Sequence, residues 1–175
     1  GQATGVQDPV QLLLAIGRAD VAARRLANPP GRNALERYRL ALRLAEHFNA
    51  RAEQARAREG IAETAGAYVT LADEAYSAGK VDEFIDFLGR AAEIGASVPE
   101  GNDVATRARA RLAGERDAAI AAGETATRSW EQAAAVAAYE RALRFDPRSE
   151  AATRGLATAR RIGQDGYVFR DTWAN

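Results

Sequence analysis

The feature that most constrains this chain is its alanine-rich pattern, in which apolar residues recur at spacings of three and four. Alanine has the highest helix propensity of all residues, and this spacing gathers apolar side chains on one face of a helix. Valine and isoleucine are sparse, and no segment alternates with the period of two that is typical of a strand. The sequence therefore predicts an all-α fold. The clearest apolar stripes comprise Leu35, Tyr38, Leu42 and Ala45, then Phe84, Phe87, Leu88, Ala91 and Ile94.

The composition excludes several classes of function. The chain carries 24 basic and 24 acidic side chains, so no net charge attracts nucleic acid or an anionic membrane. Its longest apolar run, Leu12 to Ile16, is far shorter than the roughly 20 residues of a membrane span. Cysteine is absent and His47 is the only histidine, which excludes cysteine metal sites and most histidine-based catalysis. We therefore expect no enzymatic activity, no cofactor, no metal and no nucleic-acid partner.

Proline, glycine and capping residues divide the chain into predicted helices. Asp8 followed by Pro9 is typical of a helix start, and Ser149 is a candidate N-cap for the last helix. The interior glycines Gly60 and Gly66 allow the third helix to kink or to split. The predicted helices cover residues 9–26, 33–47, 50–78, 81–94, 103–128, 131–145 and 149–162.

A pattern of small and aromatic residues is clearest between residues 122 and 147. Gly123 and Ala142 let two antiparallel helices approach closely, and Tyr139 fills the space beside them. The pattern resembles the tetratricopeptide repeat, which implies antiparallel helix hairpins stacked as a short right-handed solenoid. The resemblance depends on Ala122-Gly123 followed by Ala135-x3-Tyr139-x2-Ala142-x4-Pro147.

Two less complete copies precede this repeat. One runs Tyr68-x2-Leu71-Ala72, then Phe84-x3-Leu88-x2-Ala91, and the other is Tyr38-x2-Ala41. The spacing of the copies exceeds the roughly 34-residue unit of the family, which predicts long first helices over 50–78 and 103–128. Ala119 and Ala126 stand where the family usually has large side chains. The helix pair 103–128 and 131–145 should therefore be thinly packed.

A narrower resemblance covers residues 10–95. It rests on Leu12-Leu13-Leu14, Pro29-Pro30-Gly31-x-Asn33-Ala34-Leu35-x2-Tyr38 and Gly60-Ile61, and it continues into the copy that begins at Tyr68. This segment is similar to a helical module of proteobacterial envelope proteins that stands beside formylglycine-generating-enzyme-like domains. The tail Gly166-Tyr-Val-Phe-Arg-Asp171 is similar to the lead-in of such domains. The resemblance implies a periplasmic or envelope location, with the cytoplasm as the alternative. Because methionine is absent even at the start, where Gly1 stands, we expect a processed product or part of a longer protein.

These resemblances predict a protein–protein interaction or scaffold module, with residues 1–8 as an extension, 9–162 as the repeat domain and 163–175 as a tail or linker. Two alternatives stay open: the non-catalytic region of a larger formylglycine-generating-enzyme-like protein, and a self-assembling structural subunit. The predicted partner is a protein, either another chain, a copy of this chain or an adjacent domain. In tetratricopeptide arrays the first helices line a binding groove, which implies partner contacts at Asp73, Tyr76, Glu124, Arg128, Arg154 and Arg161. The aromatic tail residues Tyr167, Phe169 and Trp173 are predicted to pack on the last hairpin or on a partner.

The remaining conspicuous residues have simpler interpretations. His47 should be a surface residue at a helix C-terminus, where the helix dipole favours it. Asp82 and Glu83 suit a helix N-terminus for the same reason, and the arginine pairs and triplet should lie on solvated helix faces. Trp130, at a junction between helices, is predicted to belong to the core.

Overall fold

The computed structural model describes the backbone of residues 8–171 and the side chains of residues 8–162. Within residues 8–171 it contains seven α-helices, a short 3-10 helix and no strand, which confirms the predicted all-α fold. Long first helices were predicted over 50–78 and 103–128, and α3 and α5 match them; α3 runs unbroken through Gly60 and Gly66. The elements are α1 (Pro9–Ala22), α2 (Ala34–His47), α3 (Arg51–Ser77), α4 (Val81–Ala96), η1 (Pro99–Gly101), α5 (Asn102–Arg128), α6 (Gln132–Phe145) and α7 (Glu150–Asp171).

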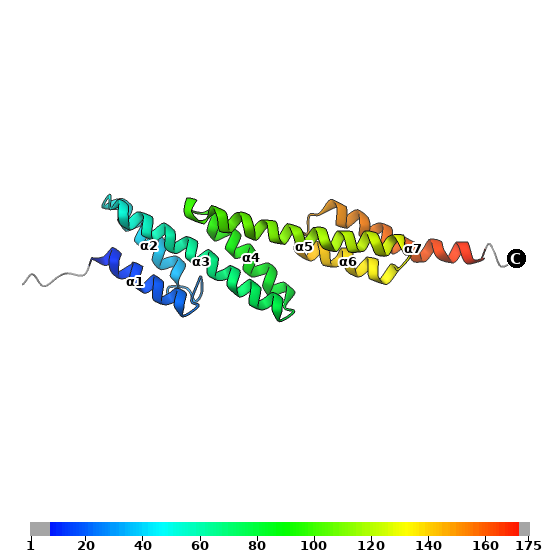
Figure 1. Ribbon diagram of the computed structural model, residues 1–175, viewed down its shortest axis with the longest axis horizontal. Helices are drawn as coiled ribbons and strands as arrows, with labels where there is room; N and C mark the ends of the chain where they lie inside the picture. The colour runs from blue at the N-terminus through cyan, green and yellow to red at the C-terminus, as the bar shows by residue number, and fades with distance from the viewer. Residues whose placement is uncertain (1–7, 172–175) are drawn as a thin grey trace, which may run out of the picture. The chain divides into compact units, whose positions relative to one another are not determined.

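The chain divides into two compact units, Gly1–Arg109 and Ala110–Asn175, and the division falls inside α5. In the first unit, α1 to α4 pack in chain order as antiparallel hairpins, and η1 contacts α3 and α4 (Figure 1). In the second unit, α6 packs against α7 and contacts α5 through Tyr139. The helices are therefore packed consecutively within each unit.

Side-chain caps explain where several helices begin. The Asp8 carboxylate accepts a hydrogen bond from the backbone N–H of Val10 at 3.0 Å, which satisfies a free donor of the first turn of α1. At α2, the Asn33 side chain accepts from the N–H of Glu36 at 2.9 Å. At α7, Ser149 Oγ accepts from the N–H of Ala152 at 3.3 Å, as predicted for an N-cap.

The C-termini of four helices share one geometry. After α1, α2, α3 and α5 the chain takes a left-handed residue, with φ between 53° and 72°. At each, one N–H reaches back five residues and the preceding N–H reaches back three, for example Lys80 to Ala75 and Gly79 to Tyr76. These bonds satisfy carbonyls that the helix end leaves free. The left-handed residues are Arg24, Asn49, Gly79 and Trp130.

Each unit contains a tyrosine that interlocks three helices. Tyr38 of α2 packs against Gly17 of α1 and Gly60 of α3, where a Cβ atom built at Gly17 would lie 2.8 Å from the ring. Tyr139 of α6 packs in the same way against Gly123 of α5 and against Gly155 of α7. The predicted contact between Tyr139 and Gly123 is confirmed.

The ends of the first and last helices differ from the prediction. α1 ends at Ala22 rather than near residue 26, because Arg24 takes a left-handed conformation and Leu26 packs into the core from the following loop. α7 continues to Asp171, although an end near residue 163 was predicted. Each interior glycine costs only about 1 kcal/mol relative to alanine, so Gly163 and Gly166 do not end the helix.

No helix in the described part of the chain combines the length and hydropathy needed to cross a membrane.

Candidate functional site

The candidate contacts of the first unit lie on the exposed side of α3. Asp73 and Tyr76 are both exposed and stand three residues apart, close to one helical turn. The centroid of the Tyr76 ring lies 5.0 Å from the centroid of the Phe84 ring. Phe84 belongs to α4 and is fully buried. The two rings are tilted by 53°, and 45% of Tyr76 stays exposed.

A forked ion pair lies beside these residues. Both terminal nitrogens of Arg24 donate to the carboxylate oxygens of Glu74 at 2.8 Å, which connects the end of α1 to α3. The hydrogen bond lowers the pKa of the Glu74 carboxyl and raises the pKa of the Arg24 guanidinium. Because both groups are exposed, the pair fixes geometry more than it stabilises the fold.

The candidate contacts of the second unit lie on α5 and α7. Glu124 and Arg128 are exposed and one turn apart on α5, and Arg128 donates to Thr125 Oγ1 at 3.2 Å. On α7, Arg154 is 3.5 Å from the Glu150 carboxylate, and Arg161 is exposed. Asp73 and Tyr76 belong to the other unit, so a single groove containing all six residues stays a prediction.

The predicted tail contacts fall outside the described side chains. The backbone of Tyr167 and Phe169 is part of α7. The side chains of both residues, and the whole of Trp173, lie outside the part that the structure describes.

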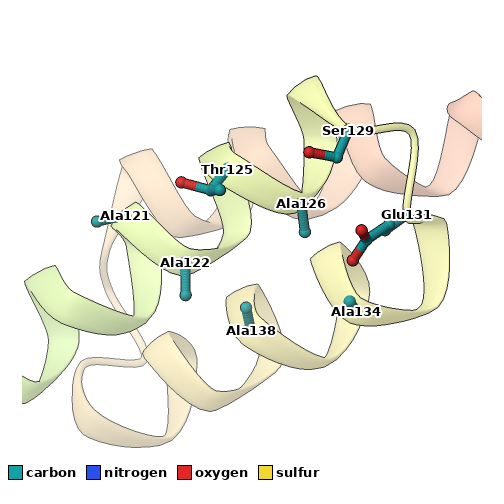
Figure 2. Close-up of a pocket in the computed structure, with 8 residues that line it drawn as sticks. All are labelled: Ala121, Ala122, Thr125, Ala126, Ser129, Glu131, Ala134 and Ala138. Carbon is teal, nitrogen blue, oxygen red and sulfur yellow. The ribbon is translucent and has the colours of Figure 1, made fainter.

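An open groove of about 500 Å³ lies between α5 and α6 in the second unit. Figure 2 shows Ala122 and Ala126 of α5 directed toward α6, with Ala134 and Ala138 of α6 directed toward α5. Methyl groups are too short to fill the space between the two helices, which agrees with the thin packing predicted for this pair. The lining residues are Ala121, Ala122, Thr125, Ala126, Ser129, Glu131, Ala134 and Ala138.

Trp130 was predicted to belong to the core, and this prediction is wrong. The residue is 71% exposed and has a φ of 58° in the turn between α5 and α6. The physical reason is its position as the left-handed residue that ends α5, where Gly79 stands after α3. Its neighbours Ser129 and Glu131 both line the groove.

A buried polar cluster in the first unit was not predicted. The carboxylate of Asp20 in α1 is only 5% exposed and accepts two hydrogen bonds from Arg25, at 2.6 and 2.8 Å. Arg37 lies 3.8 Å from its second oxygen, and the Tyr38 hydroxyl is buried without a hydrogen-bond partner. Burial, the main cause, and the charges of Glu63 and Asp20 raise the pKa of Tyr38 to about 12. The Asp20 carboxylate and the Tyr38 hydroxyl are withdrawn from solvent, while Arg25 is 45% exposed, so the cluster serves the packing of α1 and α2.

His47, Asp82 and Glu83 have the surface positions that the sequence predicted, whereas Arg24 and Arg25, predicted on a helix face, lie in the turn after α1. His47 is the exposed last residue of α2, with its ring 5.0 Å from Phe48. Asp82 and Glu83 lie in the first turn of α4. The arginine clusters are interleaved with acids, as in the exposed pair Arg107 and Asp103 at 3.2 Å. Among the described residues no cluster of three or more acidic or histidine side chains could hold a metal ion.

Two features of the site had only a partial signal in the sequence. The alanines at 119 and 126 indicated thin packing, but an open groove also requires the neighbouring alanines of α6 to face it. Trp130 follows the last turn of a helix, as Gly79 does, and this parallel was the available signal for an exposed position. The cluster around Asp20 had no signal: Arg25 is only five residues away, but Arg37 and Tyr38 approach Asp20 only through the packing of α2 on α1.

The chain matches no known family model, no curated protein and no solved structure.

Proposed function

We propose that this chain is a non-enzymatic protein–protein interaction or scaffold module of the tetratricopeptide type. The observation that carries the proposal is the pair of glycine–tyrosine–glycine interlocks, around Tyr38 and around Tyr139. Small residues that admit one aromatic ring between helices are the pattern on which the resemblance to that family rests. Helices held in this way present fixed exposed faces, which favours recognition of a protein segment.

The exposed side chains support a partner with charges of both signs. Asp73 and Glu124 offer carboxylates, Arg128 and Arg161 offer guanidinium groups, and Tyr76 offers an aromatic face. Charge-assisted hydrogen bonds and a partly exposed aromatic ring are typical means of peptide recognition. The envelope location belongs to the same proposal, since only the resemblance implies it.

A peptide-display selection against the purified chain tests the proposal. Bound peptides are then measured against Asp73→Ala/Tyr76→Ala and against Glu124→Ala/Arg128→Ala, with Arg43→Ala/Glu46→Ala on α2 as a matched control. The control residues are also exposed but belong to no candidate site. We expect at least one candidate pair to weaken binding about tenfold or more, with no change in the control.

The proposal fails if no peptide binds above background. It also fails if the control pair weakens binding as much as the candidate pairs, since recognition would then not depend on these faces.

A further inference from the structure

The Trp130 side chain contributes little to the stability of the folded monomer. It occupies a left-handed position with φ of 58°, which disfavours any side chain and which glycine adopts freely. The backbone hydrogen bonds of this turn, such as those from Glu131 N–H to Ala126 and from Trp130 N–H to Thr127, need no side chain. With 71% of the residue exposed, most of the indole stays in water. A strained, exposed tryptophan indicates a use outside the monomer.

The groove between α5 and α6 has a size and a lining that suit an indole side chain. Its volume of about 500 Å³ exceeds that of one indole, and its walls are mostly alanine methyl groups (Figure 2). At one end it carries the hydroxyl of Ser129 and the carboxylate of Glu131. Either group can accept a hydrogen bond from an indole N–H, which needs an acceptor when it is buried.

Trp130 and the groove lie at the same edge of the second unit, because Ser129 and Glu131 line the groove and Trp130 lies between them in sequence. A two-fold axis relates identical surfaces of two copies. Each copy can therefore insert its Trp130 side chain into the groove of the other copy. The flanking charges are complementary under this operation. Within the described residues no ion pair is found for Glu131, and Arg128 donates a side-chain hydrogen bond to Thr125 rather than to a carboxylate. Arg128 of each copy can therefore face Glu131 of the other.

The surface area that this contact would bury indicates its affinity. Burying a tryptophan removes roughly 150–250 Å² from water. Two such insertions, with the groove walls that they cover, amount to less than the roughly 1,200–2,000 Å² of stable interfaces. The association should therefore be reversible, with a Kd on the order of micromolar or weaker.

We propose that a second copy of this chain occupies the groove between α5 and α6, each copy seating its Trp130 in the groove of the other. The proposal rests on the proposed function, because it names one protein partner for the second unit. It does not depend on a peptide partner at Asp73 and Tyr76.

Analytical ultracentrifugation of the full chain from about 1 µM to about 1 mM tests the proposal, because this range brackets the expected Kd. A Trp173→Phe background makes Trp130 the only tryptophan, so its fluorescence emission reports burial at the same concentrations. We expect a monomer–dimer equilibrium, with Trp130 emission moving to shorter wavelength as the dimer forms.

Four single substitutions and one double substitution locate the contact. Trp130→Gly should abolish dimers and raise the melting temperature, because glycine removes the left-handed strain; an effect through misfolding would lower it. Ala134→Gln fills the groove and should weaken the dimer at least tenfold, whereas Ala137→Gln, at an exposed position of α6 outside the groove, should not. Arg128→Glu should weaken the dimer, and adding Glu131→Arg should restore it.

The proposal is overturned if the wild-type chain is monomeric throughout, or if Trp130→Gly or Ala134→Gln dimerises as tightly as the wild type. A monomeric chain that still binds selected peptides would remove this inference and leave the proposed function standing. A dimer that binds no peptide would overturn peptide recognition at the candidate faces and leave self-association through the groove standing.

Discussion

At the scale of single residues, the fold depends on two tyrosines that occupy equivalent places in the two units. Tyr38 and Tyr139 each lie on the middle helix of three, against a glycine of the preceding helix and a glycine of the following one. They are 2% and 4% exposed. Because the glycines carry no side chain, the ring can contact both backbones. One aromatic residue thus fixes the distance between three helices.

Replacing Tyr139 with alanine should lower the free energy of unfolding by about 2–4 kcal/mol. The substitution leaves a cavity bounded by Gly123 and Gly155, and the flanking backbones collapse into it only partly. Denaturant melts of Tyr139→Ala and wild type measure the difference. A loss below about half a kcal/mol would contradict the observed packing.

Tyr38 predicts a loss of stability at alkaline pH. Its pKa is raised to about 12, above the roughly 10 of an unfolded tyrosine. Above pH 10 the unfolded chain therefore ionises this residue while the folded chain keeps it neutral, so stability falls as pH rises to about 12. The loss should be about 1.4 kcal/mol per pH unit across this window, roughly 2–3 kcal/mol in all.

Urea melts at about pH 9 and about pH 11 measure this effect, and Tyr38→Phe is the control because it cannot ionise. The phenylalanine variant should lose less stability between the two pH values. An equal decline in both proteins would assign the alkaline loss to other groups.

At the scale of helices, close approach depends on where the glycines stand. In α5, a Cβ atom at Gly123 would lie 2.8 Å from the Tyr139 ring, whereas a Cβ atom at Gly114 meets nothing within 4 Å. The two glycines share one helix but only one of them is needed for packing. Sequence alone does not distinguish them, since both lie in the same alanine-rich helical pattern.

The two glycines of α5 should respond to alanine with opposite signs. Gly114→Ala should stabilise the chain by about 0.5–1 kcal/mol, through higher helix propensity. Gly123→Ala should destabilise it by about 1–3 kcal/mol, because the methyl group overpacks against Tyr139. Thermal melts of the two variants give the comparison. In a Tyr139→Ala background the cost at Gly123 should disappear; persistence of the cost would show that the ring is not its cause.

At the scale of the whole molecule, each unit is assembled from helices that are neighbours in sequence. In the first unit α1, α2, α3 and α4 pack in order, and in the second α6 packs against α7. Short connections between consecutive antiparallel helices keep contacts local, which is typical of fast-folding helical proteins. The exposed faces that result are extended helix surfaces rather than an enclosed cavity.

Circular dichroism of the isolated chain should be dominated by helix, with strand content well below a fifth. The alanine content and the seven helices of the described residues give the reason. Elemental analysis of the same sample should find no stoichiometric metal. A strand-rich spectrum would contradict the all-α architecture. A bound metal would contradict the expectation, drawn from the composition, that the chain has no metal site.

The sequence by itself determined the helical class and most helix bounds, because periodicity and caps such as Asp8 and Ser149 act within a few residues. It also indicated the contact of Tyr139 with Gly123, since a repeat pattern encodes a specific helix pairing. These are local properties, or properties repeated along the chain.

Only the tertiary structure decided the rest. The groove between α5 and α6, the cluster around Asp20 and the second contact of Tyr139, with Gly155, all depend on which helix faces come together. A side chain's burial is set by its neighbours in space, and those neighbours lie many residues away in the chain. Trp130 is exposed because it takes the left-handed conformation at the end of α5, although its apolar side chain favoured a position in the core.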